Sequence, residues 1–555
     1  MLKSSLIATA ILAVAQGASA QQPPSAGGQL QQIPPPILPA KPAPVIALQR
    51  PAPAPDAAAE GAAFRVDRLR VTGATLFSEA ELIAATGFTP GASLTLPELR
   101  NAAAAVSAFY NSRGYFLAQA YLPAQEIAGG TVTIAVIEGR YGEIALRNET
   151  RLADGVARRV MGRLRPGDPV AIAPLERSLL LLSDIPGVTV RSTLAPGTEV
   201  GTSDLTVDLA PGGRVTGSLE ADNAGNRYTG AYRFGGSLNL LNPTGVGDLV
   251  SLRLLASTEG LAYGRLAYQA PVGEATLGVS YTHMRYELGQ EFGPLDATGT
   301  ADILSVYGSY PLIRSRDANL YVFAGLDAKE LTDEIGLGSQ TSDKNSQSFN
   351  LGLRGDLRDD FGGGSWTDWS VVWTGGQLDI ESPVERAIDA VTAGRQGGFN
   401  KIQFSVARLQ TVRGPFSVYA SVRGQVATDN LDSSEQMELG GAYAVRAYPE
   451  GEAYGDEGYV ATLEARLSLD QWTQQLYGRF QLIGFVDGGQ VDFAHDPWLP
   501  GPNQTSRSGY GVGLSWYGPE DLIIRASYAR KLGDQPATSA PDEDGRAWFQ
   551  VVKLF

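Results

Sequence analysis

The 555-residue sequence contains no cysteine, which excludes a disulfide framework and a thiolate metal site. It has only two histidines, His283 and His495, and neither lies in a recognisable catalytic setting. The run Asp492–Asp496 around His495 indicates an exposed loop rather than a metal site. A Gly-x-Ser-x-Gly elbow and a phosphate-binding loop are missing too. We therefore expect a protein that is not an enzyme and that carries no cofactor and no metal.

Positive charge is also scarce, because 44 Lys and Arg stand against 59 Asp and Glu, a formal net charge of -15. A nucleic-acid-binding protein needs a basic face, so this balance argues against a nucleic-acid partner. Ordinary solvated surface charge accounts for most of the acidic residues.

Long apolar runs are missing from residues 214–555. Apolar and polar residues instead alternate in short segments, which is the period of a β-strand with two different faces. Because only helices and closed barrels satisfy every backbone polar group in a bilayer, we predict a transmembrane β-barrel of about 16 antiparallel strands. The predicted strands are 214–222, 228–240, 246–257, 261–271, 273–286, 298–312, 318–330, 346–359, 365–378, 399–411, 415–427, 457–470, 476–489, 507–517, 520–531 and 545–555.

The connections between these strands differ in length. Those after even-numbered strands are tight, whereas several after odd-numbered strands are long, as at 379–398 and 428–456. Transmembrane barrels place short turns in the periplasm and long loops outside the cell. We therefore expect the loops after odd-numbered strands to be external. Ser382–Val391, in one of these loops, is predicted to form a short helix at the barrel mouth.

Four further parts precede the barrel. Residues 1–20 have a charged start at Lys3, an apolar stretch and a small-residue end, which is the layout of a secretory signal peptide. Residues 21–62 are a Pro-rich linker that we expect to be extended or disordered, since no helical period is visible. Residues 63–140 and 141–213 both show the order strand, helix, helix, strand, strand, and predict two small α+β domains.

Two turn-forming runs follow the first two predicted barrel strands, Asp222-Asn223-Ala224-Gly225 and Asn242-Pro243-Thr244-Gly245. Both runs, and the order of the parts, resemble the two-partner secretion translocators, the haemolysin secretion/activation family of POTRA-plus-barrel proteins. The resemblance covers nearly the whole chain after residue 20. It implies that 63–140 and 141–213 are POTRA domains and that 214–555 is the barrel.

A more specific resemblance lies in the loop before the twelfth strand. Val445-Arg446-Ala447-Tyr448 is similar to the family's loop motif Val-Arg-Gly-Phe/Tyr, and Phe485-Val486-Asp487-Gly488-Gly489 matches its inner-wall motif Phe-x-Asp-x-Gly. In the family this loop folds back into the barrel, so the resemblance implies a latch between Arg446 and Asp487. Ala447 replaces the usual Gly, so either this position is not left-handed or the loop tip is remodelled.

The residues alone leave the pairing of Arg446 open. An arginine inside a barrel needs a carboxylate, and a bidentate pair would fix its distance and orientation. Strand alternation places Asp487 on the face opposite Val486, hence in the lumen if Val486 meets lipid. Equally, Arg446 could be a solvated loop residue beside Glu450 or Asp456.

The resemblance implies an outer-membrane pore of a Gram-negative cell, with its POTRA domains in the periplasm. These domains would recognise an unfolded exported protein, a large secreted β-helical exoprotein, and the barrel would translocate it to the surface. The other expected partners are outer-membrane lipid and, during biogenesis, the barrel assembly machinery, which would read the terminal Phe555. The alternative of the same architecture is a factor that assembles or inserts other outer-membrane proteins.

Overall fold

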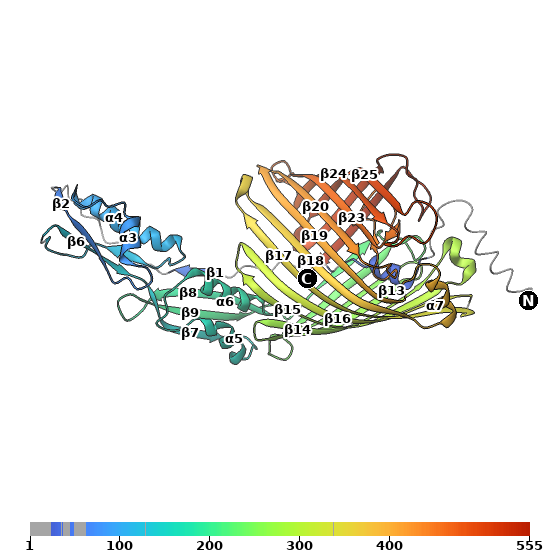
Figure 1. Ribbon diagram of the computed structural model, residues 1–555, viewed down its shortest axis with the longest axis horizontal. Coiled ribbons are helices and arrows are strands. Elements are labelled where there is room, and N and C mark those ends of the chain that lie inside the picture. Colours follow the sequence, from blue (N-terminus) through green and yellow to red (C-terminus); the bar gives the residue numbers. More distant parts are fainter. Residues whose placement is uncertain (1–23, 35, 37–44, 49–62, 128, 337) are drawn as a thin grey trace, which may run out of the picture.

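The computed structural model shows two small α+β modules and a large β-barrel that follow one another along the long axis of the molecule (Figure 1). The structure describes residues 24–34, 36, 45–48, 63–127, 129–336 and 338–555, so the predicted signal peptide lies outside the described residues. Within these ranges no helix is both long and apolar enough to cross a membrane.

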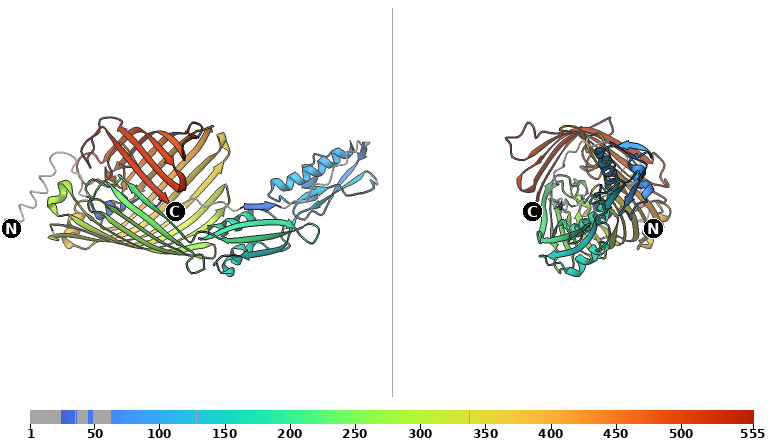
Figure 2. Two further views of the ribbon diagram at one scale, coloured as in Figure 1. Left: turned by 180° about the vertical axis from the view of Figure 1, so that it is seen from behind. Right: turned by 90° about the vertical axis from the view of Figure 1, so that its left-hand side faces the viewer.

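Sixteen antiparallel strands close into the barrel, as predicted. The first strand, β10, pairs with the last, β27, from Ser218 opposite Leu554 to Asp222 opposite Gln550 (Figure 2). The strands are β10 Val215–Asp222, β11 Arg233–Leu241, β12 Leu249–Ser257, β13 Ala262–Val272, β14 Ala275–Glu287, β15 Thr298–Arg314, β16 Ala318–Ile335, β17 Gln340–Asp359, β18 Ser365–Ile380, β19 Gly397–Arg413, β20 Phe416–Ala427, β23 Glu457–Ser468, β24 Arg479–Asp492, β25 Gln504–Tyr517, β26 Leu522–Lys531 and β27 Gly545–Leu554.

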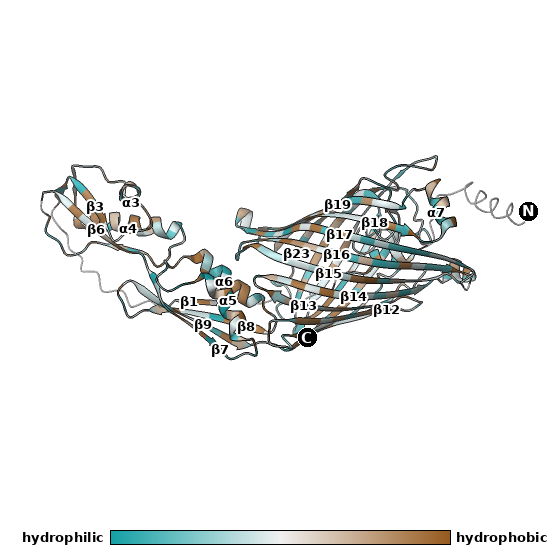
Figure 3. Ribbon diagram, turned by 60° about the horizontal axis from the view of Figure 1, so that its bottom comes forward, coloured by the Kyte–Doolittle hydropathy of each residue, from teal (hydrophilic) through white to brown (hydrophobic). Residues whose placement is uncertain are grey.

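The two faces of the barrel wall differ in polarity. On β14, Leu277 and Tyr281 are 52% and 50% exposed on the outer face, whereas Ser280 and Thr282 point inward and are buried. Figure 3 shows hydrophobic and hydrophilic residues along the barrel strands. This alternation gives the barrel an apolar exterior for lipid and a polar lumen.

The prediction for the second strand is wrong at its start, because residues 228–232 are not strand. Gly225 N–H donates to Ala231 O at 2.9 Å, and Gly230 has a φ of 105°, so the chain turns here. Tyr228 and Thr229 are buried in this loop instead of lying on the wall. The ladder from β10 into β11 therefore begins only at Arg233.

Both modules share one topology. In the first, β3 (Arg68–Thr72) is parallel to β6 (Thr131–Ile137), and β5 (Gln119–Tyr121) is antiparallel to β6. In the second, β7 (Arg140–Asn148) is parallel to β9 (Thr202–Pro211), and β8 (Val188–Pro196) is antiparallel to β9. The other elements are β2 Phe64–Val66, α3 Glu79–Ala85, β4 Ala92–Leu94, α4 Leu96–Ser112, α5 Asp154–Val160, the 3-10 helix η1 Met161–Arg163 and α6 Ile172–Asp184.

Local sequence signals explain the helices of the first module. Ser78 and Glu81 form a capping box at the start of α3. Leu99, Val106 and Tyr110, at helical spacing on α4, are buried against the sheet. The strand β5 is only three residues long, because Ala118 N–H donates to Tyr115 O in a turn that precedes it.

A buried carboxylate joins the two modules. Glu138 accepts hydrogen bonds from the backbone of Thr75 (2.6 Å) and Leu76 (2.8 Å) and from the hydroxyl of Tyr110 (3.0 Å). Burial raises the pKa of this carboxyl, but hydrogen bonding outweighs burial, and the pKa of Glu138 lies below its usual value of 4.5. Arg140 then bridges Glu138 (3.1 Å) to the carbonyl of Gly167 in the second module (2.9 Å).

The second module contacts the short turns that follow the even-numbered strands, counted from β10 as the first strand of the barrel. Arg177 reaches Glu274 in the turn after the fourth strand, β13, with an N–O distance of 2.6 Å. Arg314, at the end of β15, forms a two-pronged pair with Asp184, with both distances 2.8 Å. These turns therefore lie at the module end of the barrel, and α7 (Pro383–Ala390), the predicted loop helix, lies at the far end (Figure 1).

The expectation of an extended linker over 21–62 is wrong for its first described part. Residues Ala26–Gln31 form a helix, α2, inside the barrel (Figure 1). Its two glycines favour helix poorly, and six residues are too few for an isolated helix, so tertiary contacts must stabilise α2. A second linker segment, β1 (Val45–Leu48), pairs in parallel with Arg191–Leu194 of β8 and lengthens the second module's sheet.

Candidate functional site: a plugged barrel lumen

The loop between β20 and β23, residues 428–456, folds back into the barrel. Its residues Leu439, Val445, Ala447 and Tyr448 are all fully buried. Two short strands inside it, β21 (Met437–Glu438) and β22 (Tyr454–Gly455), pair with each other and stiffen the loop. We call this segment the lumen loop.

Arg446, near the tip of the lumen loop, meets the barrel wall at Asp487 on β24. Its Nε and terminal Nη2 donate to the two carboxylate oxygens of Asp487, each at 2.8 Å. Glu464 on β23 accepts from the remaining terminal nitrogen at 2.9 Å. The guanidinium also lies 3.4 Å from the ring centroid of Phe485, within range of a cation–π contact. Asp487 is fully buried and points inward, whereas Val486 is 48% exposed on the outer face.

The backbone of the loop tip is held by a second wall strand, β27. The indole N–H of Trp548 on β27 donates to the carbonyl of Arg446 at 2.7 Å. Ala447 does not have a positive φ, so this position is not left-handed, which was the first of the two alternatives for it. A Cβ on Gly509 of β25 would lie 2.4 Å from the Cβ of Ala447, so the absence of a side chain at Gly509 makes room for the tip. Gly489 likewise leaves room for Leu439.

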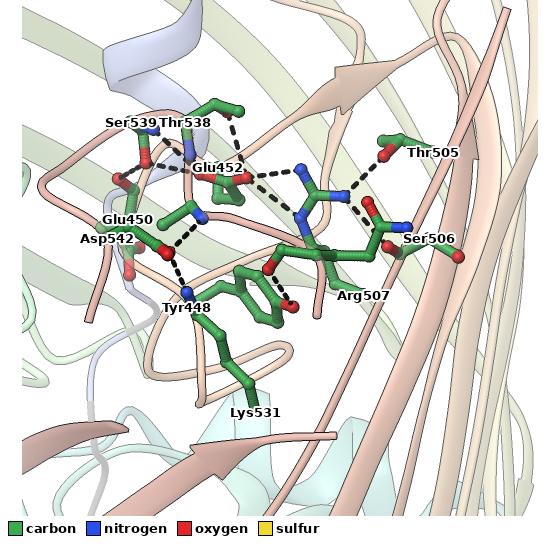
Figure 4. Close-up of polar contacts among 12 residues, drawn as sticks. Tyr448, Glu450, Glu452, Thr505, Ser506, Arg507, Lys531, Thr538, Ser539 and Asp542 are labelled. Atoms are coloured by element: carbon green, nitrogen blue, oxygen red, sulfur yellow. Dashed lines mark hydrogen bonds and ion pairs between the residues drawn. The ribbon is translucent and has the colours of Figure 1, made fainter. Parts of the chain in front are cut away.

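A second anchor lies beyond the tip (Figure 4). The carboxylate of Glu452 accepts from Arg507 of β25 at 2.7 Å, and both groups are buried. It also accepts from the backbone N–H groups of Thr538 (2.8 Å) and Ser539 (2.9 Å) in the last external loop. The Tyr448 hydroxyl donates to Gln535 O of that loop at 3.0 Å. Glu452 therefore connects the lumen loop, the wall and the last external loop.

Two buried carboxylates of the lumen loop pair with lysines of the wall. Lys344 of β17 lies 3.0 Å from Asp432. Glu435 pairs with Lys401 of β19 at 2.8 Å and with Lys329 of β16. These pairs add attachment points on the side of the barrel away from β24.

The helix α2 and its flanking residues, Ser25–Gln32, occupy the lumen next to this loop, and we call them the plug. Ser25 Oγ lies 2.8 Å from Ser433 Oγ, and Ala26 N–H donates to Asp333 of β16 at 2.8 Å. The Thr229 hydroxyl donates to Gln29 at 3.0 Å, and both side chains are buried. The plug therefore contacts the lumen loop, the wall and the first external loop through polar groups, and Ala26 and Leu30 add apolar contacts.

The run Asp222-Asn223-Ala224-Gly225 at the first hairpin holds both the plug and the barrel seam. Arg233 donates to Asp222 at 2.8 Å and to Gln32 O, at the end of the plug, at 2.9 Å. The side-chain amide of Asn223 pairs with Ala547 O (2.9 Å) and Phe549 N–H (2.7 Å) on β27. It continues the ladder between the first and last strands by one more pair of hydrogen bonds.

The run Asn242-Pro243-Thr244-Gly245 forms the first turn at the module end. Asn242 has a φ of 52°, and its side chain accepts from Gly247 N–H at 2.7 Å. Gly245 O accepts from Ala153 N–H of the second module at 2.8 Å. This turn is therefore part of the contact between module and barrel.

The C-terminal residue closes the seam at the same end. Phe555 N–H donates to Gly217 O at 3.1 Å, and Phe555 O accepts from Gly217 N–H at 2.9 Å. Its side chain is 55% exposed.

Sequence reasoning missed several of these partners. Glu464 is on the inward face of β23, so the alternation of inward and outward residues along this strand could have indicated it as a partner in the lumen. Trp548 and the pair of Glu452 with Arg507 depend on long-range contacts that no local pattern encodes. Across the described residues, His, Asp and Glu side chains nowhere form a group of three or more that could hold a metal.

The sequence profile of the family described as haemolysin secretion/activation protein ShlB/FhaC/HecB matches residues 201–516. The chain belongs to this family. The profile of the ShlB-type POTRA domain matches residues 64–139, which is the first module. As a member of the haemolysin secretion/activation family, the chain is an outer-membrane translocator of two-partner secretion, and its POTRA region lies in the periplasm.

Relatives and solved structures agree with this family. The heme/hemopexin transporter protein HuxB of Haemophilus influenzae (strain 86-028NP) is 27% identical over 84% of this chain and 82% of its own length. The outer membrane transporter CdiB of Dickeya dadantii (strain 3937) is 24% identical over 79% of this chain and 78% of its own. The structure of CdiB from Escherichia coli has the same fold, with a TM-score of 0.72 at 22% identity over 91% of this chain and 93% of its own.

Proposed function

We propose that the periplasmic modules recognise an unfolded exported partner and that the barrel conducts it to the cell surface. The observation that carries this proposal is the lumen itself. It is occupied by two separate segments, the plug and the lumen loop. Each segment is held by hydrogen bonds or ion pairs and by a small buried apolar cluster. The polar contacts can exchange for water when a segment leaves the lumen, because a net hydrogen bond contributes only about 1 kcal/mol.

The edge of β8 in the second module is the proposed receiving site. The chain's own β1 pairs with this edge through Arg191–Leu194, so the edge accepts an extended segment by backbone hydrogen bonding. Strand addition of this kind tolerates many sequences, which suits a long unfolded client. The expected client is a large secreted β-helical exoprotein.

The latch between Arg446 and Asp487 is proposed to hold the lumen loop in the closed state. The pair is two-pronged and Asp487 is fully buried, so removal of Arg446 leaves an uncompensated charge in the wall. Exit of the loop would require the same pair to separate. The latch thus fixes the resting position of the loop tip on the wall, and productive clearing of the lumen is proposed to start from this position.

The test is a secretion assay with the full chain and a candidate exported partner. Deletion of residues 64–209 is expected to leave an inserted barrel that secretes nothing. Arg446→Ala is expected to abolish secretion while the barrel still inserts. Arg479→Ala serves as the matched control, since Arg479 is an exposed arginine at the start of the same wall strand as Asp487. Secretion at the normal level by the deletion variant would contradict the recognition role of the modules.

The same strains distinguish the alternative of an assembly factor. Depletion of an assembly factor would lower the levels of unrelated outer-membrane barrels. Depletion of a translocator would remove only its partner from the medium.

A further inference from the structure

A cluster of arginines lies on one segment of the second module, from three residues before α5 to two residues after η1. Within residues 151–165, five arginines are exposed and the only acidic residue is Asp154. We call this surface the arginine face; its members are Arg151, Arg158, Arg159, Arg163 and Arg165.

Most of this charge is not neutralised by the protein. Arg163 pairs with Glu274 at 2.8 Å, and Arg158 contacts Asp154 at 3.4 Å on the solvent-exposed helix surface. Among the described residues, the side chains of Arg151, Arg159 and Arg165 form no hydrogen bond or ion pair. Three guanidinium groups therefore remain available to an external anion.

The arginine face is next to the lipid-facing rim of the barrel. Glu274, the partner of Arg163, lies in the turn between β13 and β14. The outward residues that flank this turn are apolar and exposed, with Val272 at 57% and Leu277 at 52%. Figures 1 and 2 show α5 at the outer margin of the barrel outline rather than beneath its centre. Arg163 thus lies at the periplasmic rim of the apolar belt, and the other arginines flank it in the same short segment.

We propose that the arginine face binds the headgroups of anionic phospholipids in the inner leaflet of the outer membrane. Guanidinium groups bind phosphate oxygens through paired N–H donors, and their long apolar stems suit the boundary between lipid and water. An apolar surface beside a basic cluster is the combination expected of a membrane interface. The contact rests on the family's membrane location and is separate from client recognition, which we place at the β8 edge.

Such a contact would fix the tilt of the second module against the membrane. The module already holds the barrel through turns under β11 to β16, including Arg314 with Asp184 at 2.8 Å. Headgroups bound by Arg151, Arg159 and Arg165 would add a contact on the lipid side of this module–barrel junction.

The experiment uses the purified full-length chain and counts bound lipid by native mass spectrometry. Phosphatidylglycerol is titrated against zwitterionic phosphatidylcholine. The variant R151Q/R159Q/R165Q is compared with R65Q/R68Q/R70Q, which removes the same charge from exposed positions of the first module. Each arginine near an anionic surface contributes roughly a five-fold change in affinity, so the first variant is expected to lose more than ten-fold in affinity for phosphatidylglycerol. The control is expected to retain it.

Three results would overturn the proposal. The wild-type chain could show equal affinity for the two lipids. The two variants could lose affinity equally, which would show a non-specific charge effect. Alternatively, inorganic phosphate at a few millimolar could displace phosphatidylglycerol completely, which would identify a free-phosphate site. Secretion by R151Q/R159Q/R165Q is measured in parallel and reports on the proposed function separately. If the variant loses affinity for phosphatidylglycerol but secretes its partner normally, the proposed function stands and only the lipid contact is separable from it.

Discussion

The substitution Asp487→Asn tests the latch quantitatively. Asp487 accepts four hydrogen bonds, from Arg446 N (3.2 Å), Nε (2.8 Å) and Nη2 (2.8 Å) and from the hydroxyl of Thr462 (3.0 Å). The asparagine side chain keeps one acceptor oxygen, but its NH2 group faces the N–H donors of Arg446. The negative charge at this position is lost. Loss of one member of a buried ion pair costs about 3–5 kcal/mol. Glu464 still contacts Arg446 at 2.9 Å, so the cost should be near the lower bound.

A cost of about 3 kcal/mol raises the detached population of the loop tip roughly 100-fold, since each 1.4 kcal/mol is a factor of ten. The natural chain has no cysteine, so one introduced thiol gives a clean probe. Ala444→Cys places it next to the tip, where the native side chain is 4% exposed. The labelling rate with a membrane-impermeant maleimide follows the detached population when closing is fast.

We expect Asp487→Asn to raise the labelling rate of this thiol about 100-fold. Asp492→Asn, on the same strand but paired only with the Gln504 side chain at its surface, should leave the rate unchanged. In an Arg446→Gln background, Asp487→Asn should add little, because the two groups act as a unit. A change of less than three-fold on Asp487→Asn alone would refute the assigned role of the pair.

Three further predictions concern other parts of the chain. Glu452→Gln should speed external protease cleavage within residues 532–544 at least ten-fold, because Thr538 and Ser539 lose a charged acceptor; an unchanged cleavage rate would contradict this anchor. Because folding lowers the pKa of Glu138, its stabilising effect is complete above about pH 4.5 and is lost as the pH falls below that value. Glu138→Gln should therefore lower the melting temperature of the modules at pH 7, and the difference from the natural chain should shrink as the pH falls below 4.5, measured by circular dichroism. Phe555→Ser should reduce the amount of folded barrel in membranes several-fold on heat-modifiability gels, and normal amounts would refute a role in biogenesis.

The barrel was predictable because its strands obey a strict period. Inward and outward residues differ in polarity over most of residues 214–555, so most strand bounds fall within a few residues of the prediction. The error at 228–232 has a specific cause. Tyr228 and Thr229 have strand-like composition, yet they turn inward to contact the plug. Local pattern cannot anticipate a tertiary contact of this kind.

The plug was not predictable for a related reason. The sequence Ala26-Gly-Gly-Gln-Leu-Gln31 has weak helix propensity. A Cβ on Gly27 would lie 2.4 Å from the backbone nitrogen of Ser434, so this glycine serves close packing rather than flexibility. The helix exists because the lumen supplies its contacts, including Asp333 at its first residue. The contact of Trp548 with the carbonyl of Arg446 could not be predicted either, because it joins parts of the chain that are far apart in sequence.

The most direct test of the central claim is a reversible tether between the plug and the lumen loop. The hydroxyls of Ser25 and Ser433 are 2.8 Å apart, so S25C/S433C should form a disulfide in a chain that has no other cysteine. If the exported partner crosses the lumen, secretion should fall to background under oxidising conditions and return after reduction, while both single-cysteine variants secrete normally. Secretion at the normal rate by the fully oxidised double variant would contradict passage through the barrel.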